Sequence, residues 1–179
     1  MDINLIVKIT SRAWALPILD KLHLGIPGRQ AALLAATGAG RTAFLQSLDH
    51  LLMIGLLERN PGYGHPLRPE FRLTPAGEAA AKLANEVLHI VRNDEQDLLR
   101  LCWTLPVLTT LETPHPFGEI KQSLPSITDR ALSQSLRCME QRTWIRRRVE
   151  EETRPPRPIY SAINNGAIIS SVTNAMLAS

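Results

Sequence analysis

The sequence predicts a mainly α-helical protein with small β-hairpins, built from two copies of one domain. The first observation is a repeat. A tryptophan and a Leu-Pro-aliphatic-Leu run occur in residues 14–22 and recur, 89 positions later, in residues 103–111. The second is that each copy continues with helix-period apolar spacing, a short strand, a turn-rich segment and a return strand. The third is composition, because 44% hydrophobic but only 4% aromatic residues indicate aliphatic cores, which suit helical packing.

The repeat continues through each copy with one change of register. The further matches are Gln46-Ser47-Leu48 with Gln134-Ser135-Leu136 at an offset of 88, and Phe71 and Gly77 with Tyr160 and Gly166 at 89. We therefore predict two domains, residues 1–92 and 93–179, with their boundary in the stretch from Ala79 to Asp94.

The first copy is expected to consist of helices followed by a hairpin. Helices are expected at residues 2–9, 16–24, 29–36 and 41–54, and strands at 56–59 and 71–73 around a loop, 60–66, rich in turn residues. Gly55 is placed to end the fourth helix, because glycine readily adopts the left-handed conformation that follows a helix. Thr74 and Pro75 predict the start of a long helix that reaches Val91.

The join between the copies is expected to be helical. Asn93 and Gln96 have the spacing of a capping box, which predicts a helix that restarts there and runs toward Cys102. In the second copy we expect helices at residues 117–123 and, after a turn at 124–126, along the stretch that begins at Ser126.

The stretch from Ser126 to Arg148 organises the second copy. At about 100° per residue, Leu132, Leu136 and Met139 stack on one side of a helix. A strand is expected from Trp144, a return strand at residues 158–161, and a short helix in the tail, 166–179. This is the layout of a winged helix-turn-helix, so the predicted fold class is tandem winged helix-turn-helix domains.

The opposite side of that helix carries the side chains expected to touch DNA. Hydrogen-bonding groups suited to base edges and phosphates gather there and at the hairpin tip. The candidates in the second copy are Thr128, Arg130, Ser133, Gln134, Arg137, Arg154 and Arg157. The segment from residue 137 to 157 holds seven arginines against four glutamates, so positive charge is concentrated in this helix and wing.

The first copy is less suited to reading DNA. Its candidate contacts are Arg41, Thr42, Gln46 and Arg68. Asp49 stands where the second copy has Arg137, and a carboxylate near phosphate is unfavourable. Leu45 is expected to be exposed, which suits a protein contact or a thymine methyl. Whether this copy touches DNA is left open by its sequence.

The second copy resembles the HxlR-type winged-helix transcription regulators. The residues that carry the resemblance are Trp103-Thr-Leu105, Phe117-Gly-Glu-Ile120, the segment 124–130, Leu132-Ser-Gln-Ser-Leu-Arg137 and the wing 155–161. The first copy matches more loosely, through Trp14, residues 46–48 and residues 71–77. The resemblance implies DNA-binding regulators that are usually homodimers of single-domain chains.

Other classes of function receive little support. Cys102 and Cys138 offer no disulfide framework or metal spacing, and each is expected to be a buried thiol. The five histidines are scattered, so we expect no catalytic residues, no metal and no cofactor. No apolar run reaches the length of a membrane span, and no signal peptide is recognisable, so a cytoplasmic protein is expected.

The expected function is a sequence-specific transcription regulator that binds double-stranded DNA through tandem winged helices, with the second copy's helix in the major groove. A homodimer and an unidentified small-molecule effector are compatible with this. The alternative is a winged-helix protein-interaction subunit of a chromosome-organising or other nucleoprotein complex. The acidic and apolar substitutions in the first copy favour the alternative, and the arginine-rich second copy opposes it.

Overall fold

A computed structural model describes residues 1–60, 69–150 and 156–178, and the fold is mainly helical with two small antiparallel sheets. The elements of the first part are α1 (Ile3–Thr10), α2 (Ala15–His23), α3 (Gln30–Thr37), α4 (Arg41–Met53), β1 (Leu57–Arg59), β2 (Phe71–Leu73) and α5 (Pro75–Ile90). Those of the second are η1 (Asn93–Glu95), α6 (Gln96–Leu99), α7 (Thr104–Thr109), β3 (His115–Pro116), α8 (Phe117–Ser123), α9 (Asp129–Gln141), β4 (Ile145–Glu150), β5 (Arg157–Ala162) and α10 (Asn164–Ala178).

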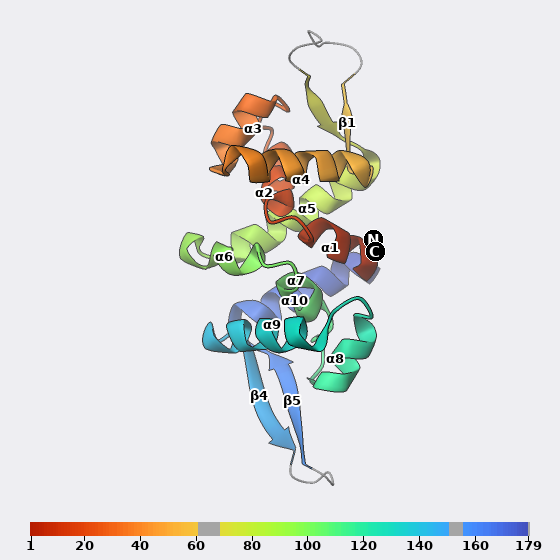
Figure 1. Ribbon diagram of the computed structural model, residues 1–179, viewed down its shortest axis with the longest axis vertical. Helices are drawn as coiled ribbons and strands as arrows, with labels where there is room; N and C mark the ends of the chain where they lie inside the picture. Colours follow the sequence, from red (N-terminus) through yellow and green to blue (C-terminus); the bar gives the residue numbers. More distant parts are fainter. Residues whose placement is uncertain (61–68, 151–155, 179) are drawn as a thin grey trace.

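The order helix, helix, helix, strand, strand, helix therefore occurs twice, in α2 to α5 and in α7 to α10, with one additional two-residue strand, β3, between α7 and α8. We call residues 1–92 the first unit and residues 93–179 the second unit. The two hairpins project from opposite ends of the molecule, along its longest axis (Figure 1). The predicted positions of the helices and strands are confirmed to within a few residues, and the tail forms a 15-residue helix.

Local geometry repeats as well as element order. Trp14 and Trp103 both precede their helices with φ near −105° and ψ near 0° (−105° and 4°, −103° and −5°). Beyond the ends of α4 and α9, Gly55 and Thr143 both have positive φ, 74° and 55°. The first is the predicted left-handed glycine. The second shows that the same chain reversal is made in the other unit by a residue that adopts this conformation less readily.

The hairpins are short and differ in extent. β1 pairs with β2 antiparallel, Leu57 opposite Leu73. β4 pairs with β5 over six residues, Ile145 opposite Ala162. A third strand that the sequence did not predict, β3, pairs with the other edge of β5, so the sheet order is β3-β5-β4. Two residues, one of them proline, were too short a run to indicate a strand. The predicted loop of the first hairpin, 60–66, lies almost wholly outside the described residues.

One cluster of buried apolar side chains runs through both units. Its largest fully buried member is Trp144, at 1% exposure. Trp14 and Trp103 are only partly buried and lie at the margin of the cluster. Trp144 has no tryptophan counterpart in the first unit.

The units are joined by packing between helices rather than by one continuous helix. α5 ends at Ile90, and Val91 is extended (φ −100°, ψ 131°) before η1 and α6 begin, so the predicted restart of helix at Asn93 is confirmed, after a short extended break. α1 packs against α7, and α10 packs against α5. The Thr10 hydroxyl donates a hydrogen bond of 2.7 Å to the Cys102 carbonyl, which ties the two units at the first of these contacts.

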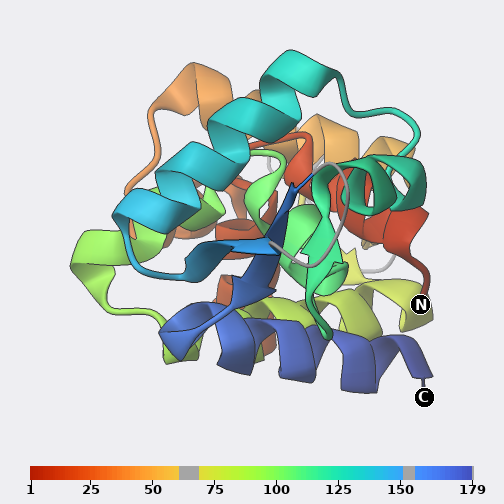
Figure 2. The ribbon, with the colours of Figure 1, turned by 90° about the horizontal axis from the view of Figure 1, so that it is seen from below.

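The arrangement places the helix-turn-helix elements of both units on one side. Figure 2 shows α4 and α9 on one side of the molecule, with α5 and α10 on the opposite side. Within the described ranges, no helix is long and apolar enough to cross a membrane.

Two glycines allow helices to approach the backbone just before the first strand of each hairpin. A Cβ at Gly77 would collide with the carbonyl oxygen of Leu56, and a Cβ at Gly166 with that of Trp144. By contrast, a Cβ at Gly118 in α8 would meet no atom within 4 Å. We predict that Gly77→Ala and Gly166→Ala each destabilise the fold by about 1–3 kcal/mol, because a backbone atom has to move.

The matched control is Gly118→Ala, which should leave stability unchanged or raise it by up to about 1 kcal/mol, since alanine is the better helix former. Chemical denaturation of the three variants measures these differences. Equal stability for all three would contradict the close approach at residues 77 and 166.

Candidate nucleic-acid interface

The second unit's recognition helix, α9, is set by a cap and by two buried anchors ahead of it. Leu124 and Ile127 in the turn are buried, which fixes the entry of the chain. Thr128 is the N-cap, and its hydroxyl accepts a hydrogen bond of 3.2 Å from the Ala131 N–H. Lys121 of α8 pairs with Asp129 at the first turn of α9, so the two helices of the motif are also linked by charge.

The helix faces are divided as the sequence predicts. Leu132, Leu136 and Met139 are buried in the core. The predicted contact residues on this helix and its cap are all exposed: Thr128, Arg130, Ser133, Gln134 and Arg137. Within the described part of the chain, neither Arg130 nor Arg137 has a carboxylate within 4.0 Å. Their guanidinium groups are therefore available to an outside partner.

The first strand of the wing carries three consecutive exposed arginines. Arg146, Arg147 and Arg148 of β4 are all exposed, although successive strand residues point to opposite faces. The reason is that the hairpin projects beyond the body of the protein, so both of its faces meet solvent (Figure 1).

Arg157, predicted to be at the wing tip, already has a partner within the chain. Its Nε lies 3.0 Å from Oε2 of Glu150, the residue opposite it in the β4–β5 ladder. The side chain remains 50% exposed. Contact with a phosphate would therefore require exchange of one anionic partner for another. Arg154, the other predicted wing contact, lies outside the described residues.

In the first unit, α4 repeats the division of faces with different side chains. Phe44, Leu48 and Leu51 are buried. The exposed residues are Arg41, Thr42, Gln46 and Asp49. Leu45 is half-buried against the core, so the prediction that it is exposed is only partly right. Arg68, the remaining predicted contact, lies outside the described residues.

Neither of the two cysteines is fully buried. Cys102 is exposed and Cys138 is half-buried, so the expectation of burial is wrong for the first and partial for the second. Desolvation by neighbouring atoms nevertheless raises the pKa of the Cys102 thiol, an effect that its backbone hydrogen bond partly offsets. Cys102 as a whole is thus exposed, while its thiol group is partly desolvated. A raised pKa lowers the thiolate fraction at neutral pH, which makes this thiol less nucleophilic.

These features define a winged-helix fold with an exposed polar helix beside an arginine-bearing hairpin. Residues 98–178 match the HxlR-like helix-turn-helix family. The resemblance of the second unit to this family is therefore confirmed. The matched segment is somewhat less than half of the chain and leaves out the first unit.

Two solved structures are similar to part of the chain. A protein described as a MarR-family transcriptional regulator from Porphyromonas gingivalis W83 has 20% identity and a TM-score of 0.42, over 46% of this chain and 81% of that one. The reduced form of the transcriptional regulator YodB from B. subtilis has 27% identity and a TM-score of 0.41, over 48% and 83%. No curated protein matches the chain.

The cap of α9 gives a test of how the recognition helix is held. We predict that Thr128→Ala lowers stability by about 1 kcal/mol, because the Ala131 N–H at the helix start loses its acceptor. Ser133→Ala, at an exposed position on the same helix, should change stability by less than about 0.5 kcal/mol. Thermal unfolding of both variants checks this, and equal melting temperatures would show that the hydroxyl does not cap the helix.

Proposed function

We propose that this protein regulates transcription by binding double-stranded DNA sequence-specifically, with α9 in the major groove and the β4–β5 hairpin beside it. The observation that carries the proposal is the exposed face of α9, where Arg130, Gln134 and Arg137 point away from the core. Guanidinium groups read guanine edges in two hydrogen bonds, and amides read adenine in the same way. The family match over this same segment supports the assignment.

In this proposal the wing contacts phosphates and does not read the base sequence. Arg146, Arg147 and Arg148 have no carboxylate within 4.0 Å in the described ranges. Exposed arginines on a projecting hairpin suit contacts with the phosphate backbone, which position a protein on DNA without reading bases. Arg157 would join them by leaving Glu150, and Arg154 remains a candidate.

We further propose that one chain provides two helix-turn-helix heads to the same DNA. α4 and α9 lie on one side of the molecule (Figure 2). Regulators made of single-domain chains need a homodimer for that arrangement. Here the heads differ: Thr42 and Asp49 of α4 stand at the positions of Arg130 and Arg137 in α9. The DNA site would then have two unequal halves. In one half α9 reads the base edges, and in the other α4 contacts the DNA through Arg41, Thr42 and Gln46.

The second candidate function is a protein-interaction subunit of a nucleoprotein complex. Asp49 is the observation that favours it, because an exposed carboxylate in the middle of α4 opposes a phosphate-lined groove. Under this alternative α4 docks on a protein, and α9 supplies whatever DNA affinity there is.

Substitutions in the two helices separate these roles. We predict that Gln134→Ala or Arg137→Ala costs about 1–3 kcal/mol of binding to the preferred site, since each removes hydrogen bonds to a base edge. Thr42→Ala and Gln46→Ala, at the matched positions of α4, should cost less. A preferred site is first selected from random duplex DNA, and affinities are then measured by fluorescence anisotropy.

All four side chains are exposed, so stability should hardly change and a loss of binding could not be attributed to unfolding. If the α4 variants lose specific binding while the α9 variants keep it, the assignment of the reading helix is reversed. If neither pair matters, the protein-interaction function becomes the better account.

The salt dependence of binding tests the wing. We predict that Arg157→Ala reduces the slope of log affinity against log salt by about 1, because one phosphate contact releases about one counterion. Arg72→Ala is the matched control, since Arg72 makes the same kind of cross-strand ion pair, with Glu58, in the other hairpin. Equal slopes for the wild type and both variants would remove Arg157 from the interface.

A further inference from the structure

A cavity of about 420 Å³ lies where the two units meet, and none of the DNA-contact candidates lines it. Its walls come from α2, the end of α3, the end of α5, and the segment η1–α6 with Arg100. This volume falls within the range of roughly 300–1,000 Å³ typical of small-molecule sites. The cavity is therefore large enough for a compact organic molecule.

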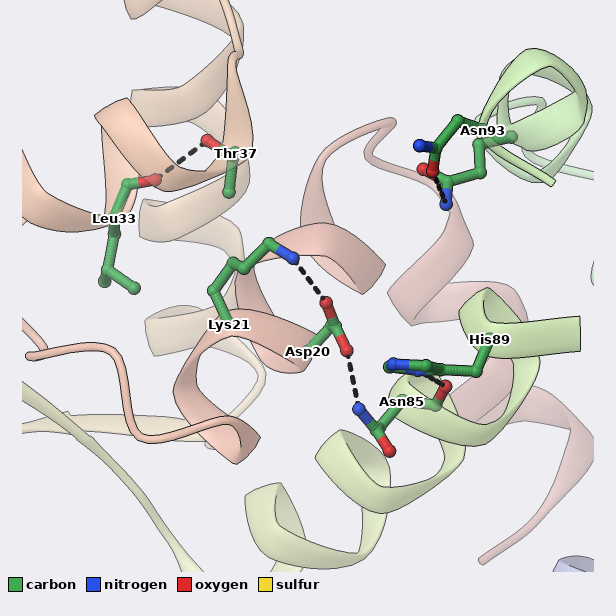
Figure 3. Close-up of polar contacts among 8 residues, drawn as sticks. Asp20, Lys21, Leu33, Thr37, Asn85, His89 and Asn93 are labelled. Carbon is green, nitrogen blue, oxygen red and sulfur yellow. Dashed lines mark hydrogen bonds and ion pairs between the residues drawn. The ribbon is translucent and has the colours of Figure 1, made fainter. Parts of the chain in front are cut away.

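The polar groups around this cavity converge from separate elements. Figure 3 shows Asp20 and Lys21 of α2 between Thr37 of α3 and the pair Asn85 and His89 of α5. The Asp20 carboxylate accepts a hydrogen bond of 2.9 Å from Asn85 and lies 3.0 Å from the Lys21 ammonium. The residue is only 4% exposed. A carboxylate is thus held inside the protein at the edge of a cavity.

Arg100 brings a second cation to the cavity, where it lies over the ring of Trp14. Its guanidinium carbon lies 5.0 Å from the centroid of the Trp14 ring, which is a cation–π contact. In the described part of the chain no carboxylate lies within 4.0 Å of it. A guanidinium stacked in this way keeps its hydrogen-bonding edges available, and these match the two oxygens of a carboxylate.

The other unit shows that these charges are not needed for the helix packing. At the offset of 89, the four charged or titratable positions Asp20, Lys21, His89 and Arg100 correspond to Thr109, Thr110, Ala178 and Ser11. Asn174, the counterpart of Asn85, donates instead to the Thr109 carbonyl at 3.0 Å. The same helix pair is therefore joined in the second unit without an ionised group. Burying a carboxylate is costly, and here the fold does not require it.

We propose that this cavity is a binding site for a small organic carboxylate that also carries a hydroxyl group. The ligand's carboxylate pairs with Arg100, assisted by Lys21, and its hydroxyl donates to Asp20 or to Nε2 of His89. His89 can accept because its Nδ1 lies 2.8 Å from the Asn85 carbonyl and must donate there, which leaves Nε2 as the acceptor of the neutral ring. Leu16, Pro17 and Leu99 provide the apolar surface for the body of the ligand.

The position of the cavity gives such a ligand a means of regulation. Residues 14–91 of the lining belong to the first unit and residues 93–100 to the second. A molecule held by Asp20 and Arg100 together contacts both sides of the join at Val91 and Arg92. It would stabilise one relative placement of the units, and with it one relation between α4 and α9. This regulatory part rests on the proposed DNA-binding function.

The chain contains its own reporter for a binding experiment. Trp14 lines the cavity, whereas Trp103 and Trp144 do not, so the three indole N–H signals of the ¹⁵N-labelled protein separate specific binding from general effects. The probes are 4-(hydroxymethyl)benzoate and its neutral isostere 4-(hydroxymethyl)benzamide. We expect the acid to shift the Trp14 signal saturably and leave the other two in place.

Variants then test the assigned contacts. Arg100→Gln should weaken binding of the acid by about tenfold or more, as expected when a charge-assisted pair is lost. Arg100→Lys should retain part of the affinity, because it keeps the charge but not the planar fork. Arg92→Gln is the control, since Arg92 pairs with Asp94 outside the cavity and its loss should change nothing. Melting curves confirm that each variant is folded.

Three results would overturn the proposal. They are equal binding of the amide and the acid, parallel shifts of Trp14 and Trp103, and no saturable shift up to about 10 mM, where even weak ligands of this size bind. A separate measurement of DNA affinity with and without the acid tests regulation, with a change of about fivefold or more expected. If the acid binds but DNA affinity is unchanged, the regulatory part is wrong. If the protein binds no DNA at all, the proposed function is wrong. The tryptophan signals then still test whether the cavity binds the acid.

Discussion

The packing of α5 is the constraint on which the rest of the structure depends. One face of this helix is buried, and most of its residues there are small: Gly77, Ala80, Ala81, Leu83, Ala84, Val87 and Leu88. Small side chains let neighbouring elements approach closely. α5 therefore packs against α2 within its own unit and against α10 of the other unit. Because one helix serves both contacts, the two halves share one core and hold α4 and α9 on the same side.

The two units show how one backbone arrangement can carry different chemistry. α4 and α9 are helices of 13 residues, each followed by a residue with positive φ and then a strand. Their buried faces are both apolar, since packing requires it. Their exposed faces are not constrained in this way, so Asp49 and Arg137 can occupy matched positions. The two helices therefore differ mainly in their exposed side chains, which are the side chains that can contact a partner.

The same reasoning applies to the interior near Asp20. Most buried positions in the described part of the chain hold apolar side chains, and four of the buried hydroxyls, Thr10, Ser47, Thr109 and Thr173, bond to a backbone carbonyl one turn earlier. These hydroxyls therefore have a hydrogen-bond acceptor within their own helix. Asp20 instead needs Asn85 of another helix and the Lys21 ammonium. A group that needs outside partners lies where two elements meet, which is also where a cavity can form.

The sequence by itself determined the elements and the repeat. Helix-period spacing, the Thr74 cap, the left-handed Gly55 and the matched Leu-Pro segments depend on local stereochemistry, which acts within a few residues and can be read from them. The exposed face of α9 was predictable for the same reason, since burial of Leu132, Leu136 and Met139 fixes what lies opposite.

Tertiary structure decided what depends on residues far apart in the chain. The strand β3 forms only because β5 offers it an edge. Exposure of Arg146 to Arg148 follows from the projection of the hairpin, and the cavity that both Asp20 and Arg100 line exists only because the two units are in contact. Such contacts are set by the packing of whole helices, which no local pattern encodes.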